Sequence, residues 1–158
     1  MGSFESFYGE HRDRLVAVLF GFVGDMTVAA DAVDEAFTKA YTRWNRISRH
    51  PEPAGWVFVT ARNEARRQMK RRTARPAFAT KTTIVGPAGE TWLLVAALPD
   101  RQREAVALRH LLGLTEQGVA EAMGITRGTV SSTLRDAYRS LGLSLADSPP
   151  IENIEARP

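Results

Sequence analysis

Apolar residues recur at spacings of three and four along residues 4–22 and again along residues 28–44, which predicts two amphipathic helices. In the first helix the positions expected to face the core are Phe4, Phe7, Tyr8, Leu15, Val18, Leu19 and Phe22. In the second they are Ala29, Val33, Ala36, Phe37, Ala40, Tyr41 and Trp44. Gly24 and Asp25 mark the turn between the two helices.

A third helix is predicted from Pro53 to about Arg72, because proline fits the first turn of a helix, where its missing N–H costs nothing. Residues 45–54 before it are expected to form a loop, since Pro51 and Pro53 exclude a regular helix there. The core stripe of this third helix comprises Val57, Phe58, Ala61, Ala65 and Met69.

The region 98–141 has the start and stop signals of three closely spaced helices. Pro99 suits a first helical turn, and Gly113 can supply the left-handed residue that ends that helix. Thr115 can cap a short helix that ends at Met123 and Gly124, and Thr126 can cap the next one. Two helices joined by so short a turn, with a third before them, are typical of a DNA-binding helix-turn-helix.

The last of these helices has two distinct faces. One face gathers Val130, Leu134, Ala137, Tyr138 and Leu141, and the other gathers Gly128, Ser131, Ser132, Arg135 and Arg139. Small residues near its start would let the backbone approach DNA and would offer hydroxyls to bases or phosphates. An ordinary surface helix with a solvated polar side remains the alternative.

The sequence therefore predicts an all-α fold of two small helical domains joined by a flexible linker, the C-terminal domain being a helix-turn-helix. Residues 73–91 lose periodicity, and helical pattern resumes at Trp92. The expected boundaries are residues 1–73 for the first domain, 74–91 for the linker and 92–143 for the second domain. Residues 144–158, with Pro149, Pro150 and scattered acids, are expected to form a disordered tail.

Composition narrows the class of protein. The chain has 158 residues, of which 44% are hydrophobic and 25% charged, and no apolar run reaches membrane-spanning length. We therefore expect no membrane insertion, and the first residues do not resemble a signal peptide. Without cysteine there is no disulfide and no thiolate metal site, which is compatible with the expected cytoplasmic location.

Charge is segregated in the first half of the chain. Asp31, Asp34 and Glu35 form an acidic ridge by their helical spacing, which hints at a basic partner or is simply a solvated surface. Residues 43–75 carry ten basic side chains against two acidic ones, an electrostatic footprint for nucleic acid. There Trp56 and Asn63 lie among cations, a composition suited to stacking unpaired bases. Alternatively, Trp56 fills a gap between helices.

These segments resemble an extracytoplasmic-function (ECF) sigma factor of bacterial RNA polymerase. Residues 31–37 with Ala40 and Tyr41 look like the family's polymerase-binding helix, and residues 55–63 with their basic continuation look like its promoter-melting helix. Residues 98–132 look like its −35-binding helix-turn-helix. Together the matches cover roughly residues 4–72 and 92–142.

The resemblance implies roles for individual residues. The residues expected to bind the β′ clamp helices of core RNA polymerase are Asp31, Asp34, Glu35 and Phe37. Those expected to open and hold the −10 element are Arg46, Trp56, Asn63, Arg66, Arg67 and Lys70. Those expected to contact the −35 duplex are Arg109, Arg127, Thr129, Ser131, Ser132 and Arg135. The β flap and an anti-sigma factor are further partners that the resemblance allows, and no cofactor or metal is implied.

Some residues depart from the family pattern. Ser131 and Thr133 stand where basic residues are usual, and Asp136 flanks the recognition helix, so weak or unusual −35 recognition is expected. The rival interpretation is a helix-turn-helix regulator that binds an operator without acting as a sigma factor. An enzyme is disfavoured, because His11, His50 and His110 lack metal-ligand spacing and no nucleophile or phosphate-loop motif is present.

Overall fold

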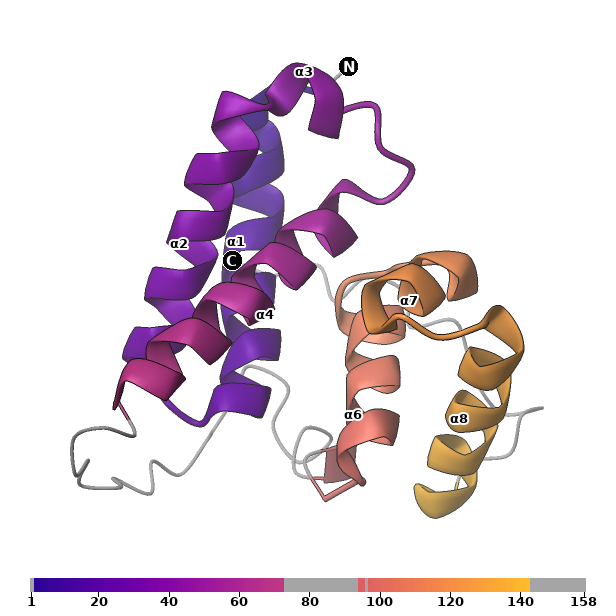
Figure 1. The fold of residues 1–158 in the computed structure, drawn as a ribbon. Helices are drawn as coiled ribbons and strands as arrows, with labels where there is room; N and C mark the ends of the chain where they lie inside the picture. The colour runs from indigo at the N-terminus through magenta and orange to yellow at the C-terminus, as the bar shows by residue number, and fades with distance from the viewer. Residues whose placement is uncertain (1, 73–93, 96, 143–158) are drawn as a thin grey trace, which may run out of the picture.

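The computed structural model describes residues 2–72, 94–95 and 97–142, and within these ranges every regular element is a helix. The elements in chain order are α1 (Phe4–Val23), α2 (Met26–Thr42), α3 (Trp44–Ile47), α4 (Pro53–Arg72), α6 (Asp100–Val106), the π-helical turn η1 (Ala107–Leu111), α7 (Glu116–Met123) and α8 (Arg127–Ser140). Figure 1 shows α1, α2 and α4 in one group, with α6, α7 and α8 in a second group beside it. The all-α prediction is confirmed; the expected linker 74–91 and tail 144–158 lie outside the described residues.

Helix ends follow the predicted capping signals. The Thr115 hydroxyl accepts a hydrogen bond from the Gly118 N–H at 3.0 Å, and Thr126 accepts from the Thr129 N–H at 3.2 Å. Gly124 ends α7 with φ of 68°, a left-handed conformation that costs glycine little. The two threonine caps and the left-handed Gly124 define the short turn between α7 and α8 that the sequence predicted.

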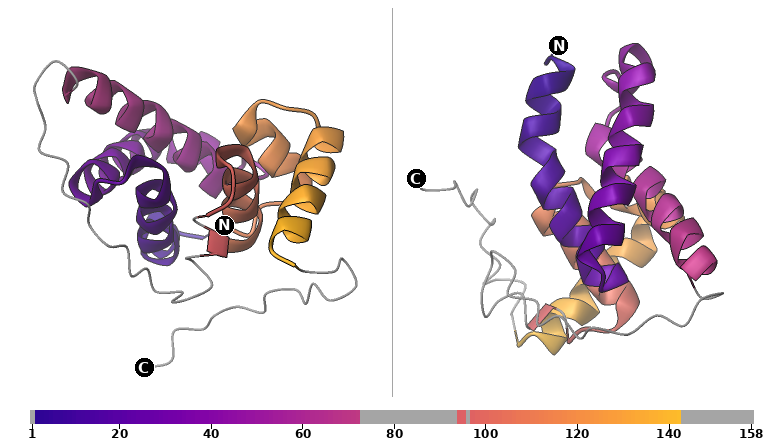
Figure 2. Two further views of the ribbon diagram at one scale, coloured as in Figure 1. Left: turned by 90° about the horizontal axis from the view of Figure 1, so that it is seen from below. Right: turned by 90° about the vertical axis from the view of Figure 1, so that its left-hand side faces the viewer.

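The first domain is a bundle in which α2 packs against both α1 and α4 (Figures 1 and 2). Its fully buried side chains include Leu15, Leu19, Val33, Phe37, Val57 and Phe58. At one end an aromatic cluster closes the bundle, with the Phe4 ring 5.0 Å from Tyr41 and 5.5 Å from Trp44 between centroids.

Three predicted core positions and one predicted loop are wrong. Tyr8, Tyr41 and Met69 are 36%, 62% and 40% exposed. Tyr41 and Met69 lie in the last turns of α2 and α4. Tyr8 and Tyr41 each contact one ring of the facing helix and leave the rest of the side chain to solvent. Helix α3 occupies the start of the expected loop 45–54. Proline restricts its own position and the residue before it, so Pro51 does not prevent a helical turn that ends at Ile47.

The second domain packs α6 and α7 against α8. Val130, Leu134 and Ala137 of α8 are buried as predicted, and Tyr138 is partly buried with its hydroxyl 2.6 Å from Nε2 of His110. The turn η1 carries His110 and continues α6 toward Gly113, whose φ is 68°.

The two domains are in direct contact in the described residues. Helix α4 packs against α7, and α1 packs against η1. Figure 2 shows the same arrangement from below and from the side. Among the described residues, no helix is long and apolar enough to cross a membrane.

Core packing predicts a large difference between two neighbouring aromatic residues. Phe37→Ala should lower the free energy of unfolding by about 3–5 kcal/mol, because it leaves a cavity where a fully buried ring was. Tyr41→Ala, one helical turn further, should cost about 1 kcal/mol or less, because Tyr41 is mostly exposed. Urea denaturation followed by circular dichroism measures both, and equal losses would contradict the assignment of Phe37 to the core.

The burial of His110 predicts a pH dependence of stability. Burial, together with the charge of Arg109, lowers the pKa of His110 from its usual 6.5. The unfolded chain therefore takes up a proton before the folded chain does, so the free energy of unfolding should fall as the pH drops below about 6.5. His110→Gln should reduce this fall between pH 7.5 and 5.5. Parallel wild-type and variant curves of unfolding free energy against pH would exclude His110 as a source.

Candidate nucleic-acid interface

The acidic ridge lies on the outer side of α2, but its members differ in their surroundings. Asp31 and Glu35 are exposed. Asp34 accepts two hydrogen bonds from the Arg12 guanidinium, at 2.8 and 2.9 Å, and this contact raises the pKa of Arg12 despite the opposing effect of burial. Phe37 is only 2% exposed, so its predicted place in a polymerase-binding surface is wrong: it supports the ridge from inside the core.

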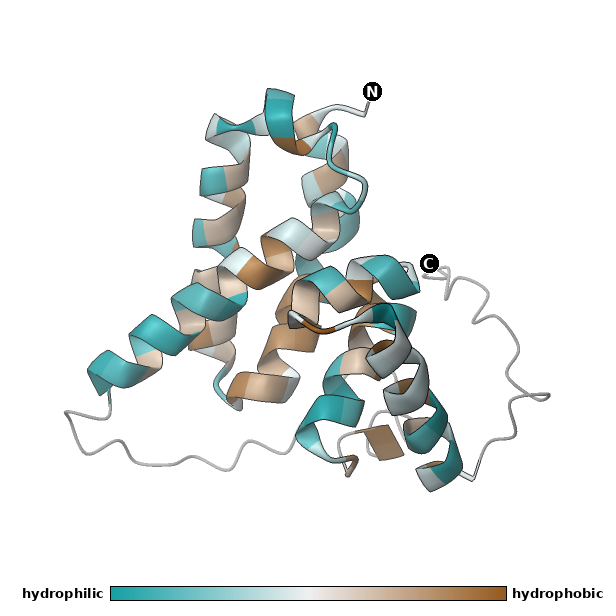
Figure 3. Ribbon diagram, turned by 45° about the vertical axis from the view of Figure 1, so that its right-hand side comes forward, coloured by the Kyte–Doolittle hydropathy of each residue, from teal (hydrophilic) through white to brown (hydrophobic). Residues whose placement is uncertain are grey.

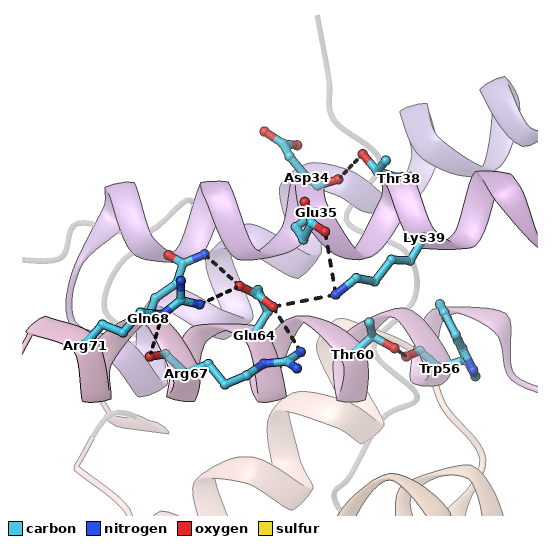
Figure 4. Close-up of polar contacts among 10 residues, drawn as sticks. All are labelled: Asp34, Glu35, Thr38, Lys39, Trp56, Thr60, Glu64, Arg67, Gln68 and Arg71. Carbon is cyan, nitrogen blue, oxygen red and sulfur yellow. Dashed lines mark hydrogen bonds and ion pairs between the residues drawn. The ribbon is translucent and has the colours of Figure 1, made fainter.

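A carboxylate that the sequence argument missed organises the cations between α2 and α4. Figure 4 shows Glu64 of α4 surrounded by Lys39, Arg67, Gln68 and Arg71. Its nearest cation is Arg67 at 3.0 Å, followed by Lys39 and Arg71 at 3.6 Å each. Burial acts to raise the pKa of Glu64, but Gln68 and the three cations outweigh it and hold that pKa below its usual value. Lys39 also pairs with Glu35, so the ridge and the basic helix are linked.

The predicted promoter-melting face lies on α4 and α3. Asn63, Arg66, Arg67 and Lys70 are exposed along α4, and Arg46 is exposed on α3. Figure 3 shows the second half of α4 mostly in the teal of hydrophilic residues. Trp56 is half-buried and packs against the core, so it fills space between helices while part of its ring remains accessible. Both alternatives for Trp56 are therefore compatible with its position.

On the helix-turn-helix, the outer face of α8 presents Arg127, Thr129, Ser132 and Arg135, all exposed. Two predicted members of this set are turned elsewhere. The Ser131 hydroxyl donates to the Glu116 carboxylate of α7 at 3.0 Å, so it points along the domain and not outward. Arg109 is half-buried and donates to the Leu114 carbonyl at 2.8 Å, which fastens the turn after η1.

Glu116 introduces a negative charge next to this face. It also pairs with Arg127 at 3.5 Å, and Asp136 pairs with Arg139 at 3.6 Å on the same helix. Two of the cations near the recognition face are therefore partly neutralised within the protein. Helical spacing could reveal the Asp136 pair, but only the folded arrangement of α7 and α8 brings Glu116 to Arg127.

The exposed residues that the sequence predicted for nucleic-acid binding are thus divided between two surfaces. One is the polar and aromatic face of α4 with α3, and the other is the outer face of α8. A basic, amide-bearing surface next to an accessible tryptophan can hold single-stranded nucleic acid. A helix-turn-helix with an exposed second helix can enter a major groove.

Comparison with protein families distinguishes a sigma factor from an operator-binding regulator. Residues 7–75 match the model "Sigma-70 region 2", and residues 89–141 match "Sigma-70, region 4". The chain belongs to the sigma-70 family. Because it combines regions 2 and 4 and matches relatives named as ECF factors, it is a sigma factor of the ECF group, as the sequence resemblance indicated. It binds core RNA polymerase and directs transcription initiation at promoters.

Individual relatives agree with this assignment. The RNA polymerase sigma-E factor of Streptomyces antibioticus is 29% identical over 147 residues, covering 87% of this chain and 82% of the relative. The ECF RNA polymerase sigma factor SigL of Mycobacterium tuberculosis is 28% identical over 154 residues, covering 89% and 87%. The operator-binding alternative is not favoured for this sigma factor.

Two solved structures share the fold. The sigma factor RpoE of Bartonella quintana, solved in complex with the anti-sigma factor NepR, superposes with a TM-score of 0.65 at 21% identity and covers 87% of this chain and 93% of that one. CnrH in complex with the cytosolic domain of CnrY gives 0.58 at 17% identity, covering 88% and 84%.

Proposed function

We propose that this sigma factor divides promoter recognition between its two domains. Residues 1–73 dock on core polymerase and open the −10 element, residues 92–143 bind the −35 duplex, and residues 74–91 connect them. The observation that carries the proposal is the exposed face of α4, where Asn63 and the cations Arg66, Arg67 and Lys70 adjoin Trp56. An operator-binding module needs no such surface.

Docking on polymerase is assigned to the exposed part of the acidic ridge. Asp31 and Glu35 are exposed and can meet a basic surface, which fits the β′ clamp helices as partner. Glu35 has a cation nearby, Lys39 at 3.6 Å, whereas Asp34 is held by two hydrogen bonds from Arg12. The strand-holding residues are then assigned on α3 and α4, where all are exposed except the half-buried Trp56: Arg46, Trp56, Asn63, Arg66, Arg67 and Lys70.

Duplex contact is assigned to Arg127, Thr129, Ser132 and Arg135, which are exposed on α8. Glu116 and Asp136 lie near these cations, so few phosphates are neutralised and this domain alone should bind DNA weakly. The protein itself carries out no reaction: it supplies binding energy and specificity to the polymerase. Its location is the cytoplasm, where that partner works, and an anti-sigma factor is a further partner, as for RpoE.

Co-purification with core RNA polymerase, followed by run-off transcription on candidate promoters, tests the whole proposal. The expected result is a stable complex that initiates at defined positions. Binding to duplex DNA without core binding or initiation would support the operator-binding alternative.

Charge reversal tests the docking surface. Asp31→Lys with Glu35→Lys should weaken core binding by about tenfold or more, because unpaired like charges would face the basic clamp. Binding to an isolated −35 duplex should be unchanged, since these residues lie in the other domain. Fluorescence anisotropy measures both affinities. The matched control is Glu5→Lys with Glu10→Lys, which moves the net charge equally on α1. If both double variants lowered the affinity for core polymerase equally, the acidic ridge would not be part of the docking interface.

Truncation on α4 tests the melting surface. Trp56→Ala with Asn63→Ala should reduce open-complex formation by about tenfold, because each stacked base loses its platform. Closed-complex formation should change much less. Permanganate reactivity of promoter thymines reports opening, and a thermal melt of each variant checks that the half-buried Trp56 is not needed for folding. Thr38→Ala, on the exposed side of α2, serves as control. Unchanged thymine reactivity would contradict the assignment.

A further inference from the structure

The contact between the two domains is built from side chains with specific partners. Glu52, just before α4, accepts hydrogen bonds from the Thr115 N–H at 2.9 Å and from the Thr115 hydroxyl at 2.6 Å. Thr115 is the residue that caps α7, so the first domain binds the helix-turn-helix at the start of its first helix. A carboxylate with two donors in one geometry is a strong, directional contact.

Two glycines make this approach possible. A Cβ atom at Gly118 of α7 would lie 2.7 Å from Cγ and Oε1 of Glu52, closer than real Cβ atoms come. A Cβ at Gly55 of α4 would lie 3.3 Å from the Leu114 side chain. Glycine within α7 costs about 1 kcal/mol of helix stability relative to alanine. The position of Gly118 is therefore explained by the space that Glu52 occupies.

Arg62 forms the second half of the contact. From α4 it pairs with Glu104 of α6 and donates to the Ala122 carbonyl of α7 at 2.9 Å. The side chains of Arg62 and Glu104 are only 17% and 18% exposed, so water screens this pair far less than it screens a surface pair. A further contact lies nearby, where the Arg103 guanidinium stands 5.6 Å from the centre of the Phe22 ring.

This closed arrangement is too short to read a promoter. The −10 and −35 elements are centred 25 base pairs apart, about 85 Å along B-form DNA at 3.4 Å per base pair. Helices α4 and α7, which belong to the domains assigned to these two elements, are in direct contact. Both domains cannot hold their elements until α4 and α7 separate.

We propose that Glu52, Arg62, Glu104 and Thr115 form an interdomain latch that keeps the free sigma factor closed and must open before promoter recognition. The inference rests on the assignment of the two domains to the −10 and −35 elements. The acidic ridge lies on α2, on the far side of the first domain from α7 (Figure 1). Core polymerase can therefore dock on the closed chain, and promoter binding then competes with the latch.

The absence of cysteine from the sequence allows two labels to be introduced without background. Gly9→Cys on α1 and Ser140→Cys on α8 are both exposed and distant in sequence from the latch, and dyes there report domain separation by energy transfer. The labelled full-length chain should show high transfer when free. Low transfer in the free chain would overturn the proposal.

Gly118→Ala is the sharpest variant, because it improves an α7 helix position while displacing the Glu52 carboxylate. It should raise the open fraction by about tenfold, the effect of losing hydrogen bonds to a charged group. Glu52→Ala should do the same, and adding Gly118→Ala to Glu52→Ala should change nothing further, because both act on one contact. Gln117→Ala, an exposed neighbour on α7, is the matched control. Unchanged transfer in both latch variants would refute the role of Glu52.

A reversible cross-link tests whether opening is required. An ideal Cβ at Gly118 lies 2.7 Å from Glu52 Cγ, so the Cβ atoms of Glu52→Cys and Gly118→Cys are at most about 4.2 Å apart, within the span of a disulfide. The oxidised protein should lose run-off transcription with core polymerase and regain it on reduction. Equal activity in both states would overturn the latch, whereas a reduced protein that directs no initiation would count against the proposed function instead.

Discussion

The close packing of α2 on α4 is the contact on which the other features of this sigma factor depend. Alanines make it possible: Ala29, Ala32, Ala36 and Ala40 on α2 and Ala61 and Ala65 on α4 are all at most 1% exposed. Small side chains let two helix axes approach. The larger Phe37 and Phe58 contact rings of α1, with Phe37 against Phe7 and Phe58 against Phe22. One side of α4 is buried against α2 in this way, and its other sides can make other contacts. One carries the basic, amide-bearing face and another carries Arg62 toward the second domain.

Local signals were strong enough to predict most helices. Thr115, Thr126 and Gly124 have defined positions relative to α7 and α8, because capping depends on residues within one turn. Burial was less predictable. A helical wheel gives the direction of an apolar arc but not how far the facing helices cover it, so it could not show that Tyr41 and Met69 are largely exposed.

The candidate sites illustrate the same limit. Exposed cations on α4 could be found from spacing, but the inward turn of Ser131 depends on Glu116, which lies on another helix. Glu52 and Thr115 are 63 residues apart in sequence, and Arg62 and Ala122 are 60 apart. No local pattern marks such pairs. A glycine inside a helix, such as Gly118, costs stability relative to alanine, and only the position of Glu52 gives it a physical reason.

Acidic residues lie among the cations of α4 and of the helix-turn-helix, and these pairs have a common consequence. Glu64 holds Lys39, Arg67 and Arg71, Glu116 holds Arg127, and Asp136 holds Arg139. Each pair competes with a phosphate for the same guanidinium or ammonium group, so the free protein has fewer cations available than its sequence suggests. Charged groups at the interdomain contact also have partners within the protein. Glu52 accepts hydrogen bonds from Thr115, and Arg62 pairs with Glu104. On the proposed assignment of these surfaces, the free protein should bind DNA poorly by itself and should need the binding energy of a second partner at a promoter. The proposed assignment therefore makes dependence on core polymerase a consequence of the charge arrangement as well as of the docking surface.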